Sequence, residues 1–286
     1  MSSNSDWYEV HKIKDDLINI KEQLDLIDPR FLTKFSNHFL LLGTKKALLI
    51  DTGAGLYPIK KIVDNIIGDR KLIVVNTHGH FDHIGGNEEF EEIYIHKMEA
   101  KVIKKPFNAF LLKKSPMKIK ERYEDRYFKF NPPKNVIEIV DGKKFDLGGL
   151  VVTAIHTPGH SDGMLSLFTD RGELFTSDTV HYGTIFLPDK KKILVLEQSI
   201  RKLQCLAKSN PEMEIYPGHE QYPLDPEIFD QLLNGIAMRN KNYTNRSIVG
   251  CFGMWQYEDE HFTYLEPITP LIRRLGIVIK NTLFAK

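Results

Sequence analysis

An apolar segment at residues 71–77, KLIVVNT, runs directly into four ligand-type side chains. A short apolar run bounded by turn residues is typical of a buried strand, so these side chains begin where that strand leaves its sheet. Because side chains alternate along a strand, His78 and His80 point the same way. Asp82 and His83 then lie on the turn into the next helix. Imidazole and carboxylate at this density predict a metal site that suits zinc, and also iron or manganese.

Three further ligand-type residues follow later apolar runs: His160 in HTPGHSDG, Asp178 in FTSDT and His219 in YPGHE. Each is therefore expected at the point where a strand leaves its sheet. With the first cluster they make five histidines and two aspartates, which is too many for one tetrahedral ion. They suit two ions about 3.5–4 Å apart that share a bridging carboxylate. The sequence therefore predicts a dinuclear metal centre.

The whole chain alternates short apolar runs with helical patterns. The predicted elements are a hairpin at 38–51, a helix ending near Gly68, strands at 71–77 and 92–96, further strands between 136 and 178, a helix at 192–208, a strand at 214–217 and a helix at 226–240. Two successive series of strands with interleaved helices indicate an α/β fold, a sandwich with mixed sheets.

The order of THGHFDH, His160, Asp178 and His219, preceded by LIDTG at 49–53, resembles the metallo-β-lactamase superfamily from about residue 38 to residue 222. This resemblance implies a four-layer αβ/βα sandwich with the metals at one edge, between the two sheets. It implies a first metal site of His78, His80 and His160, a second of Asp82, His83 and His219, and Asp178 as the bridge. It also implies that Asp51 is a buried carboxylate that orients the ligands, a support that metal sites generally require.

The aspartate at position 178, where metallo-β-lactamases usually carry cysteine, resembles the glyoxalase II and lactonase-like branches. The segments DWYEVHK and LIDTGAGL are loosely similar to metallo-β-lactamase domain-containing acyl-CoA thioesterases. The chain is accordingly expected to be a metal-dependent hydrolase, with two divalent ions and zinc favoured, that uses metal-activated water to cleave a thioester or a lactone or ester carbonyl. No glutathione-binding pattern is evident in its C-terminal part, so hydroxyacylglutathione is not favoured as the substrate.

Three residues are candidates for proton transfer. Asp82 is expected to accept a proton while it remains a ligand. Lactonase-like relatives often place a tyrosine three residues after the bridging aspartate, as a proton donor or substrate clamp. His181 holds that position here and Tyr182 follows it. Either could serve, and a packing role is the alternative for Tyr182.

One segment is strongly basic, since residues 97–134 hold 12 Lys/Arg and 4 Asp/Glu, a local charge of +8, in a chain of net charge +1. We expect a helical lid insertion at about 97–135 within a single domain of 1–286, with a core at about 8–240 and a C-terminal extension at about 241–286. The lid lysines that we expect to attract an anionic small-molecule thioester are Lys113, Lys114, Lys118 and Lys120. The alternative is a solvated helical face.

Two rival functions share parts of this motif set. An RNA nuclease would suit a basic lid, but nuclease relatives usually add a large inserted domain, so nucleic acid is not favoured as a partner. A mononuclear iron enzyme related to persulfide dioxygenases would not need the complete second ligand set.

Features elsewhere in the chain bear on its compartment and assembly. The N-terminus lacks the apolar region of a signal peptide, and no run of about 18 apolar residues predicts a membrane span. The two cysteines, Cys205 and Cys251, lack CxxC spacing and predict neither a disulfide framework nor a thiolate zinc site. We therefore expect a cytoplasmic protein. Its apolar last 40 residues are expected to pack on the body or on a second copy, as in a homodimer.

Overall fold

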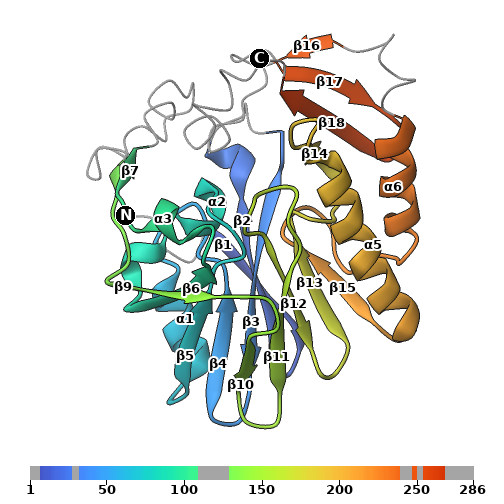
Figure 1. The fold of residues 1–286 in the computed structure, drawn as a ribbon. Coiled ribbons are helices and arrows are strands. Elements are labelled where there is room, and N and C mark those ends of the chain that lie inside the picture. Colours follow the sequence, from blue (N-terminus) through green and yellow to red (C-terminus); the bar gives the residue numbers. More distant parts are fainter. Residues whose placement is uncertain (1–6, 28–31, 109–128, 239–246, 250–253, 268–286) are drawn as a thin grey trace.

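The structure, a computed structural model, describes residues 7–27, 32–108, 129–238, 247–249 and 254–267. Its main body contains two β-sheets that pack against each other (Figure 1). The first has seven strands in the order β1-β2-β3-β4-β5-β6-β9. Their bounds are β1 Tyr8–Lys14, β2 Leu17–Gln23, β3 Phe35–Leu42, β4 Lys46–Ile50, β5 Lys71–Val75, β6 Glu92–His96 and β9 Asn135–Ile139. The first four strands pair antiparallel, whereas β4, β5, β6 and β9 run parallel, so the sheet is mixed as predicted.

The second sheet has five strands in the order β10-β11-β12-β13-β15. Their bounds are β10 Lys144–Asp146, β11 Val151–His156, β12 Leu165–Thr169, β13 Glu173–Ser177 and β15 Glu214–Pro217. Only the pair of β13 and β15 is parallel. The predicted hairpin of β3 and β4 and the predicted strand β6 are confirmed.

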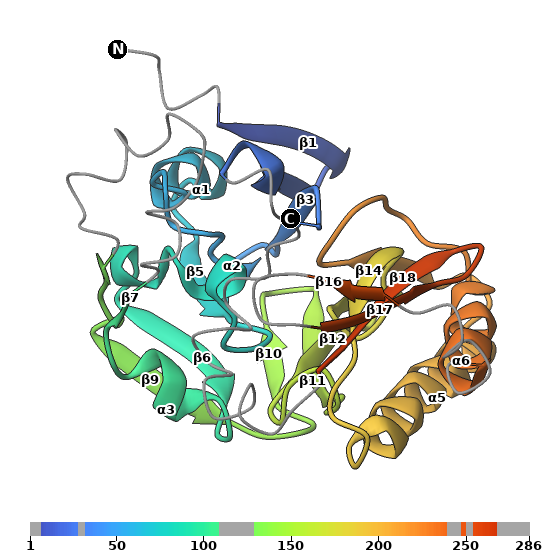
Figure 2. The same cartoon turned by 90° about the horizontal axis from the view of Figure 1, so that it is seen from above.

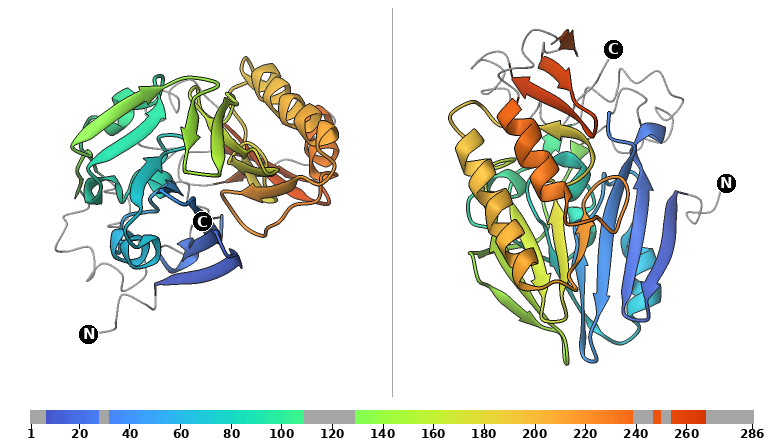
Figure 3. Two further views of the ribbon diagram at one scale, coloured as in Figure 1. Left: turned by 90° about the horizontal axis from the view of Figure 1, so that it is seen from below. Right: turned by 90° about the vertical axis from the view of Figure 1, so that its right-hand side faces the viewer.

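Helices cover the outer faces of both sheets, as Figure 2 shows from above. On the first sheet lie α1 Lys60–Ile67, α3 Ala100–Ile103 and the short elements η2 Leu24–Leu26, α2 Phe81–Ile84 and η3 Asn87–Glu89. On the second lie α5 Ile193–Ser209 and α6 Ile228–Met238, which contact each other (Figure 3). Helix α1 buries Val63 and Ile67, four residues apart and so on one face, and ends at Gly68 with a φ of 59°, as predicted.

Three hydrophobic clusters fill the spaces between these layers. One packs α1 and its neighbours against the first sheet, and another packs α5 and α6 against the second. The third lies between the sheets and contains Phe39 and Leu48 from the first sheet with Leu167 and Phe175 from the second. Alternation along β3 serves two of these cores, because Leu40 faces the helices while Phe39 faces the other sheet. The four-layer αβ/βα sandwich is thus confirmed.

A third sheet was not predicted from the sequence. It has the order β14-β18-β17-β16, with β14 Gly183–Phe186, β16 Ser247–Val249, β17 Met254–Glu258 and β18 Phe262–Pro267. It lies beyond one end of the sandwich in Figure 1. Part of the expected C-terminal extension therefore pairs with a strand of the expected core, because β18 runs parallel to β14.

The expected helical lid is only partly within the described residues. There the structure shows the four-residue helix α3 and a two-stranded sheet of β7 Phe107–Asn108 and β8 Lys129–Phe130 rather than long helices. Residues 109–128, which include Lys113, Lys114, Lys118 and Lys120, lie outside the described residues. The basic lid thus stays a prediction.

Ion pairs join the turn between β1 and β2 to the second sheet. Lys14 pairs with Glu173 at 2.9 Å and also with Glu214, and Arg171 pairs with Asp16. These ion pairs join the two sheets in addition to the apolar core between them. No helix of the described chain is both long enough and apolar enough to span a membrane.

Candidate metal centre

The seven predicted ligands lie on loops that leave strand ends. The segment that follows β5 of the first sheet and leads into α2 carries His78, His80, Asp82 and His83. The loops after β11, β13 and β15 of the second sheet carry His160, Asp178 and His219. The structure brings all seven together in two adjoining groups. Loops from both sheets therefore build the cluster, and the end of each apolar strand sets the position of the candidate ligand that follows it.

The first group contains His78, His80, His160 and Asp178, whose ligand atoms lie within 4.8 Å of one another. Nε2 of His160 is 2.8 Å from Nδ1 of His80 and 3.3 Å from Oδ2 of Asp178. Nε2 of His78 lies 3.8 Å from the same carboxylate oxygen. Oδ2 of Asp178 thus faces this group.

The second group contains Asp82, His83 and His219. Nε2 of His83 and Nε2 of His219 are 3.3 Å apart, and they lie 3.1 and 3.2 Å from Oδ1 of Asp178. Oδ2 of Asp82 is 3.5 Å from Nε2 of His219. Asp178 therefore presents one oxygen to each group, which is the arrangement of a bridging carboxylate.

Buried acceptors behind the cluster orient these rings. Oδ2 of Asp51 accepts a hydrogen bond from Nδ1 of His83 at 2.8 Å, and Oδ1 accepts one from the Thr77 backbone N–H at 2.7 Å. The carbonyl of Phe35 accepts one from Nδ1 of His219 at 3.0 Å. Because a carboxylate and a carbonyl only accept, Nδ1 of each ring carries the hydrogen and Nε2 faces the cluster.

This arrangement fits metal ions. Two neutral rings would direct the lone pairs of His83 and His219 at each other across 3.3 Å, which is unfavourable unless a cation lies between them. Nε2 of His78 is buried and has no hydrogen-bond partner among the described residues, and a buried polar atom left so is costly. Imidazole and carboxylate ligands suit zinc, iron or manganese.

Without bound ions, protonation of a histidine supplies the positive charge next to Asp178. Burial lowers the pKa of His78 well below its usual 6.5, and the neighbouring histidines lower it further. Burial also opposes protonation of His219, but the Asp178 carboxylate outweighs it and raises the pKa of His219 to about 9. A divalent ion that binds here therefore displaces protons.

The local backbone is unusual at this centre. Three non-glycine residues of the described chain have a positive φ: Asp51 at 63°, Ser177 at 47° and Glu220 at 59°. Ser177 directly precedes Asp178, and Glu220 directly follows His219. Such conformations are unfavourable for side chains with a Cβ atom, and here they occur where loops turn to present ligands.

The two predicted proton donors have different surroundings. His181 is buried, its Nδ1 donates to the Tyr182 carbonyl at 2.7 Å, and its ring centre lies 5.4 Å from that of His219. Burial and the neighbouring His219 lower the pKa of His181 to about 4, so near neutral pH its Nε2 is a proton acceptor. The Tyr182 hydroxyl donates to Gln231 at 2.9 Å, and its ring stacks on Phe262. A catalytic role for either residue stays a prediction.

Several supporting groups were not predicted from the sequence. Thr77 stands within the NTHGH motif, and its hydroxyl contacts Oδ2 of Asp51 at 2.8 Å, Nδ1 of His78 at 3.1 Å and Oγ of Ser177 at 2.8 Å. A threonine next to the first ligand was the available signal. Phe35 offered no sequence signal, because it acts through its backbone carbonyl.

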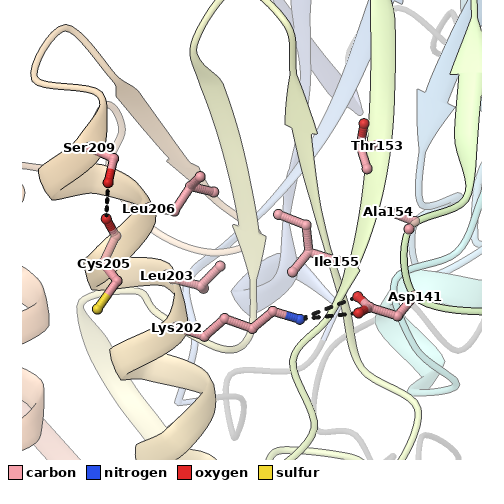
Figure 4. Close-up of a pocket in the computed structure, with 10 residues that line it drawn as sticks. Asp141, Thr153, Ala154, Ile155, Lys202, Leu203, Cys205, Leu206 and Ser209 are labelled. Carbon is pink, nitrogen blue, oxygen red and sulfur yellow. Dashed lines mark hydrogen bonds and ion pairs between the residues drawn. The ribbon is translucent and has the colours of Figure 1, made fainter.

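A separate hollow of about 430 Å³ lies between α5 and β11 (Figure 4). An ion pair between Lys202 and Asp141 crosses it, beside the apolar side chains of Ile155 and Leu203. None of the predicted ligands lines it. The candidate centre is therefore the histidine cluster and not this hollow.

The chain matches the family model of the metallo-beta-lactamase superfamily over residues 33–234. It therefore belongs to this superfamily, as its fold and ligand order indicate.

Among curated proteins, the chain is similar to the acyl-coenzyme A thioesterase MBLAC2 of Homo sapiens, with 26% identity over 233 residues that cover 75% of this chain and 81% of that protein. It is also similar to the atrochrysone carboxyl ACP thioesterase of Aspergillus fumigatus, with 30% identity over 189 residues that cover 64% of this chain and 50% of that protein. Among solved structures, a metallo-beta-lactamase from Pontibacter korlensis superposes with a TM-score of 0.54 at 17% identity, covering 80% of this chain and 99% of that one. The last similarity supports the fold alone.

Proposed function

We propose that this chain is a hydrolase with two metal ions that cleaves a thioester. The observation that carries the proposal is the Asp178 carboxylate, which offers Oδ2 to the histidines of the first group and Oδ1 to those of the second. A single-ion enzyme would not need the second group. We propose zinc as the ion, with iron and manganese as alternatives that the same ligands accept.

The ions supply the electrostatic part of the chemistry, since bound divalent ions lower the pKa of a water molecule and polarise a substrate carbonyl. The chain's own residues handle the proton. The side chain of Asp82 is 20% exposed, more than any other carboxylate in the cluster, and can take up the proton that the attacking water loses. His181, whose ring centre lies 5.4 Å from that of His219, is a second candidate acceptor.

The leaving group favours a thioester over a lactone or ester. A thiol has an ordinary pKa of about 8.5, so a thiolate leaves without much protonation, whereas an alkoxide needs a proton donor. At the start of the reaction neither His181, which is unprotonated near neutral pH, nor Tyr182, whose hydroxyl donates to Gln231, supplies such a proton, so an alkoxide would depend on the proton that Asp82 takes up. The two thioesterases among the similar proteins support the same substrate class. The cytoplasmic location and the homodimer stay predictions.

One panel tests the proposal. The zinc-loaded protein is assayed against an acyl-CoA, an acylglutathione, a lactone, nitrocefin and single-stranded RNA, and its metal content is measured. We expect release of free thiol from acyl-CoA and nearly two ions per chain. Asp178→Asn should lose at least one ion and about 100-fold or more in kcat. His11→Gln, at an exposed histidine of β1, should change neither.

Two results would count against the proposal. Full activity with one ion per chain would remove the bridging role of Asp178. Cleavage of RNA without any thioester hydrolysis, lost in His80→Ala and His160→Ala, would assign the centre to phosphodiester chemistry instead.

A further inference from the structure

The second ligand group joins the two halves of the sandwich. Asp82 and His83 belong to α2 beside the first sheet, whereas His219 comes from the turn after β15 of the second sheet. Within the described residues, the group therefore depends on how the turn at 217–220 lies against the first sheet. Strand β3 is the part of the first sheet that touches this turn, because Ser36 forms a β-bridge with His219.

One buried side chain of β3 holds that turn from both ends. Asn37 is 2% exposed, and its Nδ2 donates to the Glu220 carbonyl at 3.0 Å and to the Pro217 carbonyl at 3.3 Å. Its backbone N–H donates to the Gly218 carbonyl at 2.7 Å. A single residue thus binds three carbonyls around His219.

The conformation of the turn explains why such a contact is needed. Glu220 has a φ of 59°, which is unfavourable for a residue with a side chain. The carbonyls at both ends of the turn need donors, and the Asn37 carboxamide supplies them. Its own direction is set by Asn19, whose Nδ2 lies 3.4 Å from Oδ1 of Asn37.

We propose that Asn37 is the positioning residue of the second metal ion: by fixing the turn at 217–220 it sets where Nε2 of His219 stands, and hence how tightly that ion binds. The inference rests on the proposed dinuclear function. Asn37 is not among the clustered ligands and acts through His219. It is therefore expected to govern metal affinity, leaving the chemistry at a filled centre unchanged.

The test is a metal titration of Asn37→Leu, which keeps the branched shape of the side chain and removes both donated bonds. We expect the first ion to bind as in the wild type and the second about 10–100-fold more weakly, the usual effect of losing a support behind a metal ligand. Bound zinc is counted after dialysis against a graded chelator. At saturating zinc, kcat on a thioester should return to within about threefold of the wild type. Asn37→Ser removes the same bonds with a small polar side chain, and serves where the leucine variant does not fold.

A matched control loses an equivalent bond far from the centre. Nδ2 of Asn210 donates to the Leu206 carbonyl at 2.8 Å at the end of α5. Asn210→Leu should lower the melting temperature without changing either metal affinity.

The outcomes separate this inference from the proposed function. If the wild type binds two ions and the Asn37 variants bind each ion as tightly as the wild type does, the positioning role is overturned while the dinuclear function stands. Loss of both ions in a folded Asn37 variant would also overturn it, because the first group has no ligand on this turn. A wild type that binds only one ion would overturn the dinuclear function and this inference together.

Discussion

His181 and Tyr182 are neighbours in the chain, yet their polar atoms face different surroundings. Nδ1 of His181 is engaged by a backbone carbonyl beside the metal ligands, whereas the Tyr182 hydroxyl is engaged by Gln231 of α6. We propose that His181 takes part in proton transfer at the centre, and such a group contributes about 100-fold or more to a rate. The hydroxyl contact of Tyr182 contributes only about 1 kcal/mol to stability. The two residues can therefore be separated by measurement.

We expect His181→Gln to lower kcat on a thioester by about 100-fold while both ions stay bound. Tyr182→Phe is the matched comparison, and should keep kcat within about twofold while losing about 1 kcal/mol of unfolding free energy. Steady-state kinetics, metal analysis and urea unfolding of the two variants provide the readouts. The reverse pattern, with Tyr182→Phe inactive and His181→Gln active, would return the proton-transfer role to the tyrosine.

The clustering of the seven candidate ligands could be predicted from the sequence because each stands next to a recognisable strand end. His78 follows an apolar strand directly, and His160, Asp178 and His219 each stand beside glycine or serine turns. Asn37 carries no such signal, since its partners lie 180 and 183 residues away. Contacts of that range depend on the assembled fold and leave no local pattern.

At the scale of elements, α6 is held against the C-terminal sheet by a close approach at Gly235. A Cβ atom at this position would lie 1.7 Å from the Tyr264 hydroxyl oxygen and 2.5 Å from a carboxylate oxygen of Asp259. The Tyr264 hydroxyl donates to Asp259 at 2.8 Å. The helix can therefore pack here only because the residue has no side chain.

We expect Gly235→Ala to lower the unfolding free energy by about 1–3 kcal/mol, the usual effect of overpacking. Adding Tyr264→Phe should recover part of the loss, because it removes the oxygen nearest to the new methyl group. Urea unfolding of the two single variants and the double variant measures this coupling. Strict additivity of the two changes would show that the hydroxyl is not the obstacle.

The sheet to which Tyr264 belongs shows where prediction from sequence failed. The strand β14 follows the candidate ligand Asp178 by a few residues, and its parallel partner β18 begins at Phe262, so the pairing joins segments about 80 residues apart. The hairpin of β3 and β4 was predictable because its strands adjoin in sequence. Local patterns indicate strands, but a distant parallel partner is selected only by the packed fold.

For the whole molecule, the charged cluster around Glu173 predicts a dependence of stability on pH. Burial favours the neutral form of Glu173, but the Thr169 hydroxyl, Lys14 and Arg171 outweigh it and lower its pKa below the usual 4.5. A carboxyl with a lowered pKa stabilises the fold at pH above its unfolded value. That contribution is lost as the pH falls through the lower folded value.

Glu173→Gln should therefore cost about 1–2 kcal/mol at pH 7, and the difference from the wild type should shrink as the pH falls below about 4.5. Urea unfolding across this range, with metal ions removed, measures it. Glu138→Gln, at an exposed carboxylate that pairs with Lys104, is the control and should change stability little at any pH. A difference for Glu173→Gln that is constant with pH would mean that shape, and not charge, matters there.

The three left-handed residues have a consequence for how this protein could change over time. Glycine adopts a positive φ more readily than any of these three residues. Each side chain, however, makes a contact that glycine cannot make: Asp51 accepts a hydrogen bond from His83, Ser177 contacts Thr77, and Glu220 accepts a hydrogen bond from the Lys34 backbone. Selection for thermal stability alone would favour glycine at positions 177 and 220, whereas selection for catalysis retains the side chains. If the centre lost its role, the constraint on Ser177 and Glu220 would be relaxed, and glycine could replace either residue without the backbone penalty.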